Sequence, residues 1–189
     1  MKLKSPVFVA LVLLVVVGSV FRVAGFAPQI AMAIFGAAVI KDKRLAFALP
    51  LLSMLISDLV YQLLFTMGYM PYSGFYRGAS FYDSQVLNYM LLGSLALFGF
   101  YASNLKLGRI ITAIIAAPVF YFLVSNLLVW MGGAGYVRPQ TLEGLMMCYS
   151  DGLPFLRSSL VNTAVFSTVL FGGYFLVNYY MLQRKKEMI

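Results

Sequence analysis

The stretch from Leu49 to Tyr69 is the feature that most constrains the fold of this chain. Its residues are largely apolar, and as one α-helix they are long enough to cross about 30 Å of hydrocarbon. Asp58 lies inside this stretch, directly after Ser57, and Gln62 follows one turn later. A carboxyl group at that depth costs on the order of 3 kcal/mol, so it needs a partner, a water-filled cavity or a proton. Asp58 is therefore the first candidate functional residue, and the alternative is an anchor that hydrogen-bonds two helices together.

The composition shows that apolar segments are a property of the whole chain and not only of the stretch around Asp58. Hydrophobic residues make up 62% of the 189 residues and charged residues 11%, whereas soluble domains carry about a quarter charged residues. The net charge of +8 has a simple source, because Lys and Arg gather at the ends of apolar segments, as cytoplasmic retention requires. We find no basic-aromatic tracts of the kind that bind nucleic acid. We therefore expect an integral membrane protein with no nucleic-acid partner.

Several kinds of chemistry are excluded by missing residue types. The chain has no histidine, and Cys148 is its single cysteine. Zinc sites of the usual kind, His-ligated haem, Ser-His-Asp triads and structural disulfides within one chain are therefore excluded. An intramembrane acid-base site at Asp58 would also lack a second carboxylate at the same depth. We expect no enzymatic activity and no cofactor.

The apolar segments predict an all-α bundle of six transmembrane helices, forming one domain over residues 1–189 with both termini in the cytoplasm. The predicted spans cover residues 6–25, 28–40, 45–68, 86–103, 110–131 and 158–182. In this topology, all Lys and Arg residues except Arg22, Arg77, Arg138 and Arg157 lie on the cytoplasmic side, as the positive-inside rule predicts. The second span is rich in Ala and Gly, which favours a position inside the bundle.

A short amphipathic helix is expected in the connection between the fifth and sixth spans. Thr141 is a suitable N-cap, and the residues after it place an apolar face at helical spacing (Leu142, Leu145, Met146 and Tyr149). Asp151 and Gly152 are predicted to end this helix, and Pro154 to prevent its extension. We expect it to lie on the outer surface of the membrane.

The predicted topology gathers polar residues in the outer half of the bundle. One interpretation is that they line a cavity open to the outside, where they bind a small polar solute. The other is that they hold the helices together by hydrogen bonds. The one-sided distribution favours a cavity, in which Asp58 holds the solute, the asparagines orient it and Trp130 stacks on it. The candidate solute-binding residues are Asp58, Gln62, Asn88, Asn126, Trp130, Asn162 and Arg22.

Several motifs resemble those of an uncharacterised family of small bacterial membrane proteins. The most specific are Asn126-x-x-x-Trp130, the segment Thr141-Leu-Glu-Gly144-Leu, and Pro154-Phe-Leu-Arg157 before the last span. Ser57-Asp58 also fits, and the resemblance extends over most of the chain from about Gly25 onward. It implies a multi-pass protein of the bacterial cytoplasmic membrane, and it implies no assigned function.

The layout is also distantly similar to the substrate-binding S components of energy-coupling-factor vitamin transporters. Those proteins have six helices, bind vitamins in an outward-facing cavity, and carry an acidic residue near the end of the third helix, which Ser57-Asp58 resembles. The resemblance implies a partnership with an energy-coupling membrane subunit and its ATPases. S components dock through an Ala-x-x-x-Ala surface on the first helix, whereas in this chain the nearest example is Ala33 and Ala37 in the second span.

Two functions are therefore expected from the sequence. The first is an S-component-like protein that binds a small polar or vitamin-like solute for uptake, with membrane lipid and a coupling subunit as partners. The alternative is a structural or assembly subunit of a larger membrane complex, with other membrane subunits as partners and no ligand of its own.

Overall fold

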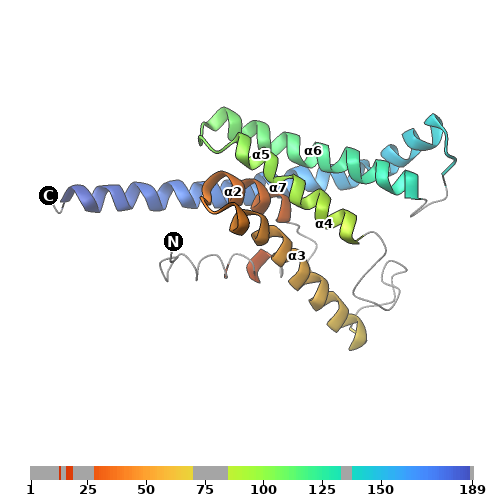
Figure 1. The fold of residues 1–189 in the computed structure, drawn as a ribbon, viewed down its shortest axis with the longest axis horizontal. Helices are drawn as coiled ribbons and strands as arrows, with labels where there is room; N and C mark the ends of the chain where they lie inside the picture. The colour runs from red at the N-terminus through yellow and green to blue at the C-terminus, as the bar shows by residue number, and fades with distance from the viewer. Residues whose placement is uncertain (1–12, 14–15, 19–27, 70–84, 133–137, 188–189) are drawn as a thin grey trace.

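A computed structural model describes residues 13, 16–18, 28–69, 85–132 and 138–187 (Figure 1). In this part of the chain the regular elements are all helices, so the prediction of an all-α protein is confirmed there. The helices are α2 (Gln29–Val39), α3 (Lys43–Thr66), α4 (Gln85–Ser94), α5 (Ala96–Tyr101), α6 (Leu107–Gly132) and α7 (Leu142–Glu187). The first predicted span, residues 6–25, lies almost wholly outside the described residues.

Helix α2 lies at the centre of the bundle, as its small residues predicted. Nine of its 11 residues are buried, and it contacts α3, α5 and α7. Close approach depends on glycine, because a Cβ at Gly99 of α5 would collide with the backbone of Ile34. Small residues allow helix backbones to approach in this way. At 11 residues α2 is only about 17 Å long, which is shorter than the hydrocarbon core.

Three helices are long and apolar enough to cross a membrane: α3, α6 and the stretch of α7 from residue 142 to 183. Residues 85–101 form a shorter apolar unit that is interrupted by a turn at Leu95, between α4 and α5. The predicted fourth span, 86–103, is therefore two consecutive short helices. The lengths of the described helices are those of a multi-pass membrane protein, but they do not by themselves establish six spans.

Helix α7 contradicts the prediction of a separate amphipathic helix before the last span. It continues for 46 residues, with Gly152 and Pro154 inside it. Gly152 does not end the helix because it is buried against α6, where a Cβ would come within 2.6 Å of Asn126 Oδ1 and 2.8 Å of Phe122 Cε2. The tight contact with α6 stabilises the helical conformation here. It offsets the free-energy cost of the backbone hydrogen bond that Pro154 cannot make.

The length of α7 shows that the bilayer cannot cover all of it. A helix of 46 residues is about 69 Å long, more than twice the thickness of the hydrocarbon core. Figure 1 shows α7 running along α6 and then past the other described helices to the C-terminus. The predicted span of residues 158–182 therefore corresponds to the central part of one longer helix.

The helix pairs establish relative chain directions. Trp130 near the end of α6 lies beside Pro139 and Gln140, which precede α7, and Phe122 lies beside Gly152 further along α7. Helices α6 and α7 are therefore antiparallel. By contrast, Phe35 near the end of α2 packs its ring on Phe171 and Tyr174, while Pro28 and Met32 line the same cavity as residues 161–162. Helices α2 and α7 are parallel, as the predicted topology requires.

Candidate functional site

Asp58 joins α3 to α4 through a compact polar cluster. Its side chain is 3% exposed, and its Oδ2 accepts hydrogen bonds from Tyr89 OH at 2.7 Å and Gln85 Nε2 at 3.1 Å. Gln85 Nε2 also lies 3.1 Å from Tyr89 OH, so the three groups form a closed triangle. Gln85 and Tyr89 are four residues apart on α4, which places them on one face of that helix.

Gln85 and Tyr89 were missed as candidate site residues in the sequence analysis. Gln85 was assigned to the preceding loop, and Tyr89 to the interior of an apolar span. Their i, i+4 spacing could have indicated them. It places both side chains on one face at the outer end of the predicted fourth span, at the same membrane depth as Asp58 in the predicted topology. The geometry of their bonds to Asp58 is that of an anchor between helices.

The neighbouring candidates Gln62 and Asn88 lie on the same two helices. Gln62 is half-buried, one turn after Asp58 on α3. Asn88 is half-buried on α4, and its Oδ1 accepts a hydrogen bond from Tyr121 OH of α6 at 2.7 Å. Helix α4 is therefore tied by polar side chains to α3 on one side and to α6 on the other.

Asn126 and Trp130 lie at the contact between α6 and α7. Asn126 Nδ2 donates to the Phe122 carbonyl of its own helix at 2.8 Å, and the thiol of Cys148 lies 3.5 Å from the Asn126 carbonyl oxygen. Trp130 Nε1 donates to the Pro139 carbonyl at 3.0 Å. These contacts fasten the start of α7 and the segment before it to α6.

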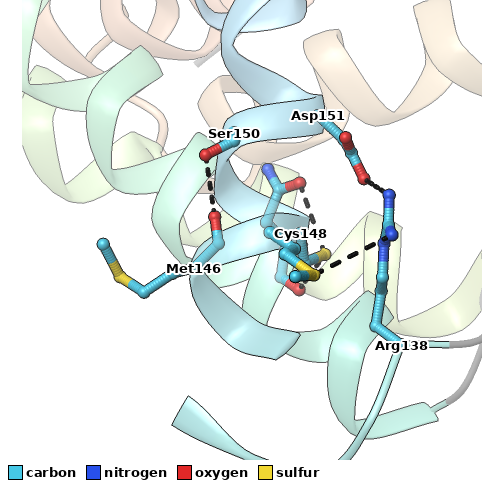
Figure 2. Close-up of polar contacts among 7 residues, drawn as sticks. Arg138, Met146, Cys148, Ser150 and Asp151 are labelled. Atoms are coloured by element: carbon cyan, nitrogen blue, oxygen red, sulfur yellow. Dashed lines mark hydrogen bonds and ion pairs between the residues drawn. The ribbon is translucent and has the colours of Figure 1, made fainter. Parts of the chain in front are cut away.

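An ion pair lies at the same end of the molecule, where α6 ends and α7 begins. Figure 2 shows the Arg138 guanidinium reaching the Asp151 carboxylate on α7, and its Nη1 also lies 4.0 Å from Met147 Sδ. Both side chains are partly exposed, so this pair contributes at most about 1 kcal/mol. It positions the segment before α7 more than it stabilises the fold.

Asn162 lies elsewhere, in the wall of a cavity between α2 and α7. The cavity has a volume of about 480 Å³. Asn162 is 8% exposed, and its Nδ2 lies 3.5 Å from Ser158 Oγ, a long hydrogen bond. The described lining residues are apolar except for Asn162; they are Val17, Gly18, Pro28, Met32, Val161, Asn162, Val165, Phe166, Val169 and Leu170.

Gln29 connects this cavity to α3. Its Nε2 lies 3.5 Å from the Gly18 carbonyl oxygen and 3.3 Å from Ser53 Oγ, and Gly18 is part of the cavity wall. Gln29 Oε1, Thr163 Oγ1 and Ser167 Oγ are buried and make no hydrogen bond in the described part of the chain.

The seven candidate residues do not converge on one point in the described structure. Asp58 belongs to the α3–α4 cluster, Asn126 and Trp130 to the α6–α7 contact, and Asn162 to the cavity. Arg22 lies outside the described residues. Across the described ranges, no three His, Cys, Asp or Glu side chains are grouped as a metal ion would require.

The helices and their burial pattern define an all-helical protein with the long apolar helices of a multi-pass membrane protein. The chain belongs to DUF6580, a family of unknown function, whose family model matches residues 2–186. This confirms the resemblance to an uncharacterised family and extends it toward both ends of the chain. Neither a curated protein nor a solved structure matches the chain.

Proposed function

We propose that this protein is a membrane-embedded solute-binding protein, with an S-component-like role in the uptake of a small vitamin-like compound. The observation that carries the proposal is the cavity between α2 and α7, about 480 Å³ in volume. Ligand sites typically measure about 300–1,000 Å³, with mostly apolar walls and a few polar groups that orient the ligand. Asn162 is such a group, because it lies in the wall and is almost fully buried.

The predicted topology supports an outward-facing position for this cavity. Its walls come from the start of α2 and from residues 161–170 of α7. Both helices run inward in the six-span arrangement, so both of these segments belong to its outer half. Arg22 is close to Gly18 in sequence and stays a candidate for the same site.

Asp58 has a different role in this proposal from the one expected on sequence grounds. The described cavity wall does not include it, and Tyr89 and Gln85 both donate to its Oδ2. We assign Asp58 to the alignment of α3 with α4, and solute contact to Asn162.

Native mass spectrometry of protein extracted in mild detergent, with analysis of the small molecules that co-purify, tests this proposal. Val165→Phe places a larger side chain in the cavity wall, and we expect it to lose the bound compound. Val177→Phe is the matched control, because Val177 lies on the same helix, is exposed and is not part of the described wall. A wild-type protein without ligand, or equal ligand in the two variants, would overturn the proposal.

The assembly-subunit alternative is favoured by the C-terminal part of α7. Of the residues from 175 to 182, all except Asn178 are exposed, on every side of the helix. Nothing in the described part of the chain covers this stretch, so lipid or a partner helix must cover it in a membrane. A ligand-free wild-type protein that arrives in the mass spectrometer with other subunits in fixed stoichiometry would establish this function instead.

A further inference from the structure

The cavity between α2 and α7 is open on the side that faces the bilayer. Val161, Val165 and Val169 are spaced four residues apart, so they form one stripe along α7. They line the cavity, yet they are 56%, 55% and 65% exposed. Within the predicted span 158–182, the surroundings of such a stripe are lipid chains. A molecule dissolved in the bilayer therefore reaches this cavity without crossing a polar surface.

Among the described residues of the wall, Asn162 has the one polar side chain. Asn162 is more than nine-tenths buried, and its Nδ2 makes a long hydrogen bond, 3.5 Å, to Ser158 Oγ. No hydrogen bond to Asn162 Oδ1 is present among the described residues, which leaves this oxygen as an acceptor for a ligand. An amide oxygen in an apolar cavity favours a neutral donor, because a charged group would be expensive to desolvate there.

From this geometry we infer the ligand class: an amphipathic, lipid-soluble molecule with an alkyl or isoprenoid body and a hydroxyl group. The body packs against the valine stripe and Met32, and the hydroxyl donates to Asn162 Oδ1. The ligand enters from the bilayer. This inference rests on the proposed function, and it replaces the polar solute expected from the sequence with an apolar compound that carries one donor.

Photolabelling in proteoliposomes tests the ligand class. The probes are a long-chain alcohol with a diazirine in its chain and the methyl ether of the same alcohol, which has no donor. Peptide mapping by mass spectrometry measures the labelling of residues 161–170. A neutral hydrogen bond changes affinity by roughly three- to tenfold, so we expect the alcohol to label these residues more strongly than the ether by that factor.

Three variants test whether the difference in labelling depends on Asn162 and on the cavity wall. Asn162→Leu keeps the side-chain size and removes the acceptor, so the alcohol and the ether should label it equally. Val165→Phe should reduce labelling by both probes, and Val177→Phe should reduce neither. If Asn162→Leu fails to fold, the ligand class is still tested by comparing alcohol and ether labelling of the wild type, and by the two valine variants.

The outcomes separate this inference from the proposed function. Equal labelling of the wild type by alcohol and ether, or unchanged labelling of Val165→Phe, overturns the ligand class. If native mass spectrometry then finds a charged, water-soluble compound that Val165→Phe loses, the proposed function stands and only the ligand class is wrong. A protein with neither a co-purifying compound nor a labelling difference overturns both.

Discussion

At the scale of single residues, buried and half-buried polar side chains of this protein connect helices in pairs. Asp58 connects α3 with α4, and Asn88 connects α4 with Tyr121 of α6. Asn126 packs against Gly152 of α7. Hydrogen bonds between membrane helices contribute on average only about 0.6 kcal/mol each, but the Asp58 cluster combines two of them between α3 and α4. The Asp58 cluster is therefore the polar contact whose loss should be easiest to measure.

Tyr89→Phe tests this cluster. The substitution removes the hydroxyl that donates to Asp58 Oδ2 at 2.7 Å and leaves the ring in place. We expect a loss of about 0.5–1.5 kcal/mol, the net contribution of one hydrogen bond, because Gln85 Nε2 still donates to the same carboxyl oxygen. Thermal unfolding in detergent, followed by intrinsic fluorescence, measures it as a lower Tm.

Tyr101→Phe is the matched control for that measurement, because Tyr101 is exposed at the end of α5. We expect its Tm to equal that of the wild type. Equal Tm values for both variants would show that the cluster is not an anchor. A Tyr89→Phe protein that keeps its bound ligand while losing stability would separate the α3–α4 cluster from the α2–α7 cavity.

At the scale of elements, α6 and α7 are in tight contact at Gly152, where side chains of α6 pack against the missing side chain of the glycine. A methyl group there would lie 2.6 Å from Asn126 Oδ1 and 2.8 Å from Phe122 Cε2, distances at which the Asn126 amide and the Phe122 ring must move away. The glycine is therefore a packing residue inside a continuous helix. Glycine often ends a helix, but Gly152 does not. Side chains of α6 occupy the space that a side chain at this position would need.

Gly152→Ala should destabilise the protein by about 1–3 kcal/mol, the usual effect of overpacking. Gly172→Ala on the same helix is the control, because nothing lies within 4 Å of its added Cβ. Alanine favours a helix over glycine by about 1 kcal/mol, so the control should be neutral or slightly stabilising. If both variants melt at the same temperature, α6 and α7 are not in close contact at Gly152.

At the scale of the whole molecule, α6 and α7 run in opposite directions, which the predicted topology also requires of the fifth and sixth spans. Lys106 lies in the turn after α5 and Arg109 in the first turn of α6, while the segment before α7 lies at the other end of α6. These two segments are therefore separated by the length of α6, which is 26 residues or about 39 Å. This is enough to place them on opposite sides of a bilayer.

Cysteine labelling in whole cells tests this orientation. In a Cys148→Ala background the chain has no other cysteine, and both Ser103 and Glu143 are exposed. We expect a membrane-impermeant thiol reagent to label Glu143→Cys in intact cells and to label Ser103→Cys only after permeabilisation. The reverse pattern would show that the protein is inserted the other way round.

The predictions that succeeded depend on local composition and residue spacing. The apolar stretch from Leu49 to Tyr69 forms most of α3, and the Ala- and Gly-rich segment after Pro28 is buried at the centre of the bundle. Each follows from the properties of neighbouring residues in the chain. The six-span arrangement and the solute-binding roles remain predictions.

The sequence by itself determined that this is a helical protein with apolar, membrane-length segments, because hydrophobicity and helix length are properties of contiguous residues. Only the tertiary structure decided that α7 continues through Gly152 and Pro154, that Gln85 and Tyr89 bond to Asp58, and that Asn162 lies in a cavity beside α2. The physical reason is the same in each case. These features depend on contacts between helices whose residues are far apart in the chain, and no local pattern encodes which faces will meet.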